Sequence, residues 1–386
     1  MPVSKFYTLF WIIYYPFCLV LYESSQFQYV DELLTMVLFA YLFLGHKIRE
    51  QSCKQEFYAY LLIITGYLLY SFVISVTTPK GVILDFFQQL RPYIVFYSTW
   101  ILAPHLSNVQ KKIILFVTLT SSLIYFYILY RNTGLVDGEY GMLSVIFLAC
   151  GIAYCCFTES TPFNKCIALI IILLGLFSGK SKYMGQCVVF IYLIFFLKRK
   201  INFHSIGTYI SMLVVVSAVI FFAWDKFNAY YIDGFKADAE EIARPMSYVT
   251  GLKILKDYIP FGSGLGSFCT AAAAKEYSPL YYKYELDHIW GLSPDNPMFI
   301  ADCYYPSLAE FGVVGVILFL IFWKRRLNDI QKIRDIKFYR LALMCVLALA
   351  IDSTSNTAYL SGGGMVLFVI LAICLNSNRN ERHVLG

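Results

Sequence analysis

Long apolar runs separated by short polar stretches extend along most of this chain. Runs that approach the thickness of a bilayer lie near residues 6–21, 30–45, 57–76, 82–103, 111–130, 141–157, 163–178, 183–197, 205–224, 303–323, 338–352 and 357–376. The pattern predicts an all-α polytopic integral membrane protein with about twelve transmembrane helices. One long polar interval separates the ninth run from the tenth. We therefore expect a single membrane domain over residues 1–386, with residues 225–302 inserted as one large loop.

The composition and the placement of charge agree with this prediction. Hydrophobic residues make up 59% of the chain and charged residues only 15%, which is more apolar surface than one soluble core can bury. The net charge of +6 is divided into short patches between the apolar runs, so we expect no nucleic-acid partner. Most basic residues of the short loops fall on one side, and the opposite short loops hold only Lys80, Arg131, Lys180 and Lys182. The positive-inside rule then predicts that both termini are cytoplasmic and that the large loop lies outside.

Neither a cleaved leader nor a metal site is expected. The first apolar run follows a single Lys5 and lacks a small-residue cleavage site, so it is interpreted as a retained span. Most of the eleven cysteines lie inside apolar runs, and no Cys or His residues have metal-ligand spacing. We expect no cofactor.

Within the large loop, the spacing of apolar residues predicts one helix. Residues 238–258 place Tyr248, Leu252, Leu255 and Ile259 three or four positions apart, on one face. We expect this face to pack against the membrane body and Pro260 to end the helix.

Two basic features stand out in the membrane part. Arg91 lies near the middle of an apolar run, where a charge costs roughly 2.5–3.5 kcal/mol and is a candidate functional residue by default. The alternative is an arginine that meets lipid headgroups above a kink at Pro92. The outer turn from Ser178 to Gly185 carries Lys180 and Lys182 against the charge rule, so these lysines either bind an anion or are solvated turn residues.

The large loop holds the remaining candidates for phosphate binding and proton transfer. Arg244 precedes Pro245, where a guanidinium could bind a phosphate or form an ion pair with Glu240 or Glu241. His288 is the one histidine on the outer side, and it is either a base or a structural hydrogen-bonding residue. Asp302 lies where the loop returns to the membrane, so it could act as a base or cap the next helix.

Glycine and aromatic residues complete the set of loop candidates. Gly262, Gly264 and Gly266 give a GxGxG pattern with no strand before it, which indicates a tight turn whose backbone could approach a ligand. Aromatic residues that could stack on sugar rings, or anchor the loop at the bilayer surface, follow this turn: Tyr277, Tyr281, Tyr282, Tyr284 and Trp290.

In this order, Arg91, SGKSKYMG, Arg244 with FGSGLGSF, and DCYYPSLAEFGVVG resemble motifs of the bacterial O-antigen polymerase and O-antigen ligase superfamily. The family's Ser-Arg pair is matched by Ser181 and Lys182, a departure that changes how a phosphate would be held. The ligases commonly have His-Asn before the tenth span, whereas Asp302 occupies that place here and is more similar to the polymerases.

The resemblance implies a bacterial inner-membrane protein that carries out glycosyl transfer outside the cytoplasm without a metal or a nucleotide sugar. A polyprenyl-diphosphate-linked glycan would be the donor, and a hydroxyl of another lipid-linked repeat unit the acceptor. Arg91, Lys182 and Arg244 would stabilise the leaving diphosphate, and Asp302 or His288 would accept the proton. Lys180, the three glycines, Tyr281, Tyr282 and Trp290 would contact substrate. A chain-length regulator and a flippase are expected partners.

Three other functions fit the same features, one of them a noncatalytic scaffold in a polysaccharide assembly complex. A ligase would transfer finished glycan to lipid A core or another acceptor. A flippase or transporter for lipid-linked glycan would also have about twelve spans, but such proteins tend to contain internal repeats, and none is visible in this chain.

Overall fold

The structure is a computed structural model that describes residues 1–20, 30–43, 51–133, 141–202, 206–222 and 242–377, with single positions at 224, 228 and 232. These residues form helices joined by turns, and among them no β-strand occurs. Of the predicted loop over residues 225–302, the description covers residues 242–302 and the positions 228 and 232.

The described residues up to Phe222 form nine helices that coincide with the first nine expected spans. They are α1 (Val3–Tyr15), α2 (Val30–Phe43), α3 (Gln51–Ile74), α4 (Pro79–Leu102), α5 (Asn108–Thr133), α6 (Gly141–Phe157), α7 (Pro162–Leu174), α8 (Ser181–Ile191) and α9 (Ile206–Phe222). Short π or 3-10 turns extend α1 to Val20, α7 to Ser178 and α8 to Phe196.

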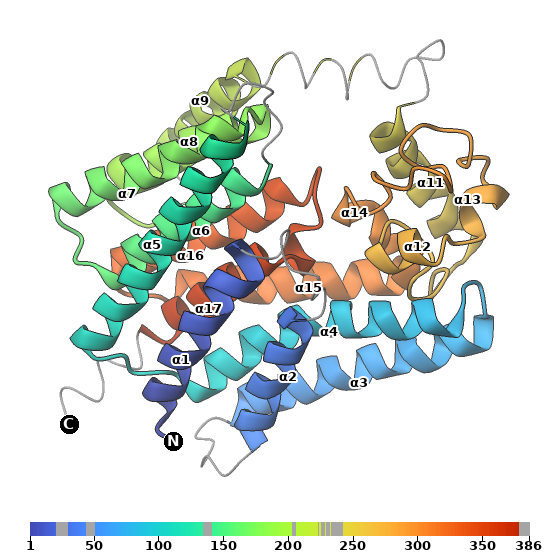
Figure 1. The fold of residues 1–386 in the computed structure, drawn as a ribbon, viewed down its shortest axis with the longest axis horizontal. Coiled ribbons are helices and arrows are strands. Elements are labelled where there is room, and N and C mark those ends of the chain that lie inside the picture. The colour runs from blue at the N-terminus through green and yellow to red at the C-terminus, as the bar shows by residue number, and fades with distance from the viewer. Residues whose placement is uncertain are drawn as a thin grey trace.

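The second half contains the loop helices and three further apolar helices. They are α11 (Ala243–Asp257), α12 (Ala271–Lys275), α13 (Leu280–Lys283), α14 (Tyr304–Ser307), α15 (Gly312–Gln331), α16 (Ile336–Asp352) and α17 (Gly362–Leu375). In Figure 1, α11, α12 and α13 gather at the end of the molecule away from the N-terminus, next to the ends of α3 and α4.

Among the residues that the structure describes, three helices are long and apolar enough to cross a membrane. They comprise Cys53–Ile74, Asn108–Asn132 and Tyr304–Gln331, with 22, 25 and 28 residues. A bilayer core needs about 20 helical residues. Shorter apolar helices accompany them at Gly141–Phe157, Pro162–Ser178, Ser181–Phe196 and Gly362–Leu375.

The packing of these helices resembles that of a membrane protein. α17 is buried along nearly its whole length and packs against α4, α6 and α16. α3 and α5 instead expose large apolar side chains: Leu62, Leu69, Phe72 and Val73 on α3, and Phe116, Leu123, Ile124 and Tyr127 on α5. An apolar outer surface around a buried central helix is stable next to lipid and unfavourable in water.

The described part of the loop has a small core of its own. Its buried members come from α11, the segment around α12 and α13, and the turns after them: Ile254, Phe268, Cys269, Leu280, Tyr281, Leu286, Ile289, Leu292 and Ile300. Because this segment buries its own apolar residues, it is a folded part of the protein attached to one end of the helical bundle.

The expected helix in the loop is present, but two of the four side chains predicted to lie on its buried face are exposed. The described helix runs over Ala243–Asp257, and the Leu252 and Ile259 side chains are 69% and 65% exposed. The buried face instead carries small residues, including Ser247, Thr250 and Gly251. Gly251 lies against the Pro306 backbone, so small side chains let α11 approach α14 more closely than leucines would allow.

Candidate functional site

Two predicted site residues from opposite ends of the loop meet in the structure. Arg244, in the first turn of α11, donates through Nε to Asp302 Oδ2 at 2.5 Å. Both side chains are about one quarter exposed, at 26% and 22%, so the pair remains accessible. The Arg244 guanidinium also lies 5.7 Å from the ring centre of Phe299. The salt bridge fixes the arginine while leaving it within reach of a ligand.

Lys182 joins this pair from a different part of the chain. Its ammonium donates to the backbone oxygens of Asp352 and Ser355 at 3.3 and 3.1 Å, and lies 3.5 Å from Asp352 Oδ1. It also interacts electrostatically with Asp302, Arg244 and Lys180. We call Lys182, Arg244, Asp302 and Asp352 the charge cluster.

Backbone and side-chain bonds hold the segments of the charge cluster together. The Tyr304 amide donates to the Ser353 carbonyl at 3.1 Å, joining the end of the loop to the end of α16. The Tyr248 hydroxyl donates to the Thr354 carbonyl at 2.8 Å, joining α11 to the same turn. Four segments distant in sequence therefore converge where the loop enters the bundle.

Lys180 lies next to the charge cluster in sequence, but its side chain extends toward a different helix, α6. Its half-buried side chain reaches the start of α6, where a Cβ on Gly141 would collide with its ammonium. With Lys180 nearby, three cations and two carboxylates share this region, so its formal charge is positive. An anionic ligand is therefore favoured over a cationic one.

The aromatic candidates divide into exposed and buried residues. Trp290 is 67% exposed and packs edge-on against Phe299 at 5.2 Å, which places it one ring away from Arg244. Tyr282 is also exposed. Tyr281 is fully buried, stacks on Phe268 and accepts a hydrogen bond from the Cys269 amide. Burial raises the pKa of the Tyr281 phenol well above its ordinary value, and the residue belongs to the core of the loop.

His288 is exposed on the same segment as Trp290. Its neighbour Ile289 is buried in the loop core, so the alternation of the two residues turns the imidazole outward.

The three loop glycines lie against the protein itself. All have positive φ angles, +82°, +87° and +70° for Gly262, Gly264 and Gly266, as the predicted tight turn requires. A Cβ on Gly262 would collide with the backbone at Gly312, and one on Gly266 would collide with the carbonyl of Gly81. In this conformation the glycines allow the turn to dock on α3, α4 and the start of α15.

Two buried carboxyl groups hold this glycine turn. Asp85 Oδ2 accepts from the Gly266 amide at 3.0 Å, and Glu310 Oε1 accepts from the Phe268 amide at 2.7 Å. Both side chains are fully buried and interact with each other electrostatically. We call Asp85 and Glu310 the carboxyl pair.

Arg91 forms a third polar group, with partners from α2. Its guanidinium donates to Asp31 Oδ2, and to Glu32 Oε1 at 3.4 Å, and the arginine and aspartate are both buried. Two carboxylates neutralise the arginine in this conformation. A phosphate at Arg91 would have to compete with them.

Several important residues were missed or underused in the sequence analysis. Asp352 ends an apolar run and looks like an ordinary interfacial residue, although a carboxylate at the end of a span is itself a signal. Asp31 and Glu32 are acidic residues near an apolar run, and Glu310 lies inside one. Which basic residue each of them meets depends on contacts between distant segments.

An aromatic pocket lies between α3, α4 and α15. Tyr304, two residues after Asp302, is one of its lining residues, which are Tyr60, Ile63, Ile64, Tyr67, Gln89, Tyr93, Tyr304, Leu308, Phe311, Gly315, Leu318 and Phe319. Among the residues that the structure describes, no group of three His, Cys, Asp or Glu side chains could hold a metal ion.

Searches against protein-family models and against curated proteins give no match to the chain. The similarity to the polymerases and ligases therefore rests on the motifs quoted above.

Proposed function

We propose that this protein is a membrane glycosyltransferase that polymerises surface polysaccharide from polyprenyl-diphosphate-linked repeat units on the outer face of the membrane. The observation that carries the proposal is the convergence of Lys182, Arg244 and Asp302. Each was a candidate on chemical grounds, and they come from separate parts of the chain. About twelve spans, cytoplasmic termini and an outer loop complete the proposed arrangement.

The proposed reaction needs positive charge at the leaving group and a base at the attacking group. The acceptor hydroxyl oxygen bonds to the anomeric carbon of the donor, and the bond from that carbon to the diphosphate oxygen breaks. Lys182 and Arg244 stabilise the departing diphosphate, and Asp302 accepts the hydroxyl proton. Asp352 positions Lys182 through the contact at 3.5 Å.

The surroundings of the charge cluster suit the two parts of such a donor. Exposed Trp290 offers an aromatic face for a sugar one ring away from Arg244. The aromatic pocket offers an apolar surface for the start of a polyprenyl chain, and Tyr304 links it to Asp302 along the backbone. A polar head and an apolar tail could then bind simultaneously.

The test is gel electrophoresis of lipid-linked and surface glycan from a deletion strain complemented with wild type, Arg244→Ala or Lys253→Ala. Lys253 is exposed on the same helix as Arg244, so its variant controls for a change in α11. We expect single repeat units in the deletion strain and with Arg244→Ala, and a ladder with wild type and Lys253→Ala.

The other outcomes identify the alternatives. Long polymer that accumulates on the polyprenyl carrier in the deletion strain would make the protein a ligase. Single lipid-linked units trapped at the cytoplasmic leaflet would make it a flippase. A normal ladder with membrane-inserted Arg244→Ala would remove this arginine from the site.

A further inference from the structure

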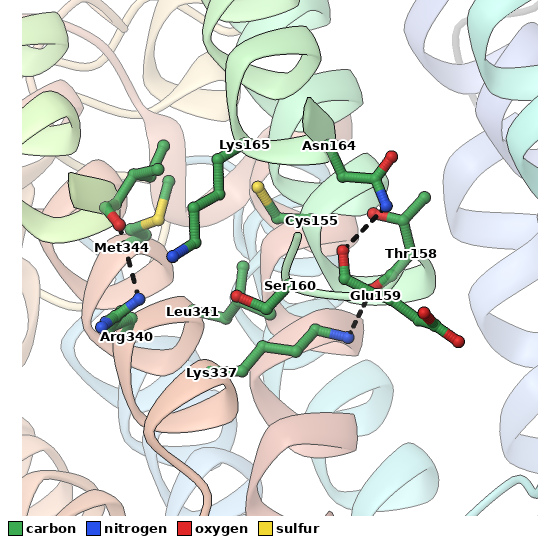
Figure 2. Close-up of a pocket in the computed structure, with 11 residues that line it drawn as sticks. Cys155, Thr158, Glu159, Ser160, Asn164, Lys165, Lys337, Arg340, Leu341 and Met344 are labelled. Atoms are coloured by element: carbon green, nitrogen blue, oxygen red, sulfur yellow. Dashed lines mark hydrogen bonds between the residues drawn. The ribbon is translucent and has the colours of Figure 1, made fainter. Parts of the chain in front are cut away.

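A basic pocket lies near the start of α16, at the opposite end of this helix from the charge cluster. It is formed by the α6–α7 turn, the first turns of α16 and the end of the π-helical turn after α8, and Figure 2 shows its lining side chains. α16 carries Arg340 near its start and Asp352 at its end, so roughly 18 Å of helix separates the two sites.

Two of the three cations in this pocket are held in place by backbone carbonyls. Lys337 Nζ donates to the carbonyls of Cys156 and Thr158 at 2.9 and 2.7 Å, at the C-terminal end of α6. Arg340 donates to the carbonyls of Leu197 and Ile194 at 2.6 and 3.4 Å. These bonds fix the positions of the charges and leave further N–H groups on both residues, since an ammonium has three donors and a guanidinium five.

The third cation of the pocket is Lys165, and its position is not fixed by bonds to backbone carbonyls of the kind that hold Lys337 and Arg340. Lys165 extends from α7 into the pocket (Figure 2), and no residue in the described part of the chain forms an ion pair with it. Glu159 also lines the pocket, and Asp335 interacts electrostatically with Arg340. Three cations against one lining carboxylate leave the pocket positive.

The remaining lining is amphipathic. Thr158, Ser160 and Asn164 lie on the polar side, whereas Cys155, Ile194, Leu341 and Met344 make up the apolar part. A small soluble anion would use only the polar side. A phospholipid would use both, with its phosphate at the cations and its first acyl carbons on the apolar side chains.

We propose that this pocket binds the phosphate of an anionic phospholipid from the surrounding membrane. The phosphate accepts hydrogen bonds from Lys165, Lys337 and Arg340, and the glycerol and upper acyl chain contact Leu341 and Met344. This inference does not depend on the proposed enzymatic function, because none of these residues belongs to the charge cluster.

The test is native mass spectrometry of the purified full-length protein in detergent, titrated with phosphatidylglycerol or phosphatidylcholine. We expect wild type to retain phosphatidylglycerol at least about fivefold better, as one well-placed cation contributes about that factor near a lipid phosphate. Lys165→Glu should lower this retention by about tenfold or more, because it removes one attraction and adds a repulsion.

Matched variants keep the result interpretable. Lys198→Glu makes the same charge change at an exposed lysine outside the pocket and should leave retention unchanged. Lys165→Gln removes the charge alone and replaces the reversal variant if that one does not fold. Equal retention of both lipids by wild type, or wild-type retention by the folded Lys165 variants, would overturn the proposal.

A competition arm separates the two sources of a phosphate group. Inorganic phosphate at millimolar concentration should displace little phosphatidylglycerol if the acyl contacts contribute. If inorganic phosphate binds in a Lys165-dependent manner and neither lipid is retained, the lipid assignment is overturned, and the pocket is a site for a soluble phosphate.

Discussion

The charge cluster and the carboxyl pair both place ionisable groups in a very apolar protein, yet they are built differently. In the carboxyl pair, Asp85 and Glu310 are fully buried, and each accepts a hydrogen bond from an amide of the glycine turn. In the charge cluster, Arg244 and Asp302 remain about one quarter exposed.

This difference indicates which polar group is structural and which is available for chemistry. A buried group whose bonds all go to its own chain stabilises the fold and has no room for substrate. A partly exposed group with excess positive charge can exchange a contact for a ligand. Substitutions in the carboxyl pair should therefore affect stability first, and those in the charge cluster should affect activity first.

The largest effect on stability is expected for Glu310→Ala. This change leaves the Phe268 amide and the Thr270 hydroxyl without their acceptor, at a cost of roughly 2–6 kcal/mol for two buried donors. The loss of stability would be measured by heating the detergent-solubilised protein and detecting the remaining folded fraction by size-exclusion chromatography. Glu310→Gln keeps an acceptor and can donate to Asp85, so it should remain close to wild type. Equal melting of the alanine variant and wild type would contradict a structural role.

The next effect is on activity, at Lys182. Lys182→Met removes a cation from the proposed leaving-group site and should slow polymerisation about 100-fold, as loss of one electrostatic donor does in other enzymes. Lys182→Arg keeps the positive charge and should therefore retain more of the wild-type rate than Lys182→Met does. The assay is incorporation of labelled repeat units by purified protein in liposomes. Equal rates for the methionine and arginine variants would show that the charge at this position is unimportant.

A smaller loss of stability is expected for Gly262→Ala. The φ angle of +82° costs an L-residue roughly 1–2 kcal/mol, and the added Cβ collides with the backbone at Gly312. Gly66→Ala is the matched control, since a Cβ there meets nothing within 4 Å in the helix α3. The control should melt at or slightly above the wild-type temperature. A melting temperature of Gly262→Ala equal to that of wild type would mean that the turn is not docked on α15.

The smallest effect concerns the exposed contact between the loop and the start of α4. Lys80 Nζ lies 2.7 Å from Glu276 Oε1, and its hydrogen bond lowers the pKa of the Glu276 carboxyl below the ordinary 4.5. The folded pKa is lower than the unfolded one, so this stabilisation is present above pH 4.5 and is lost as the pH falls through the folded pKa. Lys80→Ala should cost less than about 1 kcal/mol and lose its effect in high salt. Melting of both proteins at pH 7 and pH 3.5 would test this, and a larger difference at pH 3.5 would contradict it.

The comparison also shows how far a single sequence can predict this structure. Apolar runs located the helices, because lipid and a helical core both demand continuous apolar segments. Lys182, Arg244 and Asp302 were identified because charged residues near membrane segments are expensive. Their convergence in space was not predicted, since it depends on how distant segments pack.

The same limit explains the errors and omissions. Leucine and isoleucine spacing suggested the buried face of α11, but close packing against Pro306 requires small residues such as Gly251 instead. Arg91 was identified without its partners Asp31 and Glu32, which lie on another helix. Asp352 was missed because its importance comes from Lys182, which is 170 residues away in sequence.

The mutual contact of Gly262 and Gly312 sets how the outer segment can move. The Tyr70 hydroxyl donates to the Gly262 carbonyl at 2.7 Å, and the Gly264 amide donates to the Glu310 carbonyl at 2.9 Å. These bonds join the segment to α3 and to the start of α15, so it cannot swing about this turn as a hinged cover. For the proposed polymerase, a fixed outer segment would require the growing glycan to slide past a stationary site.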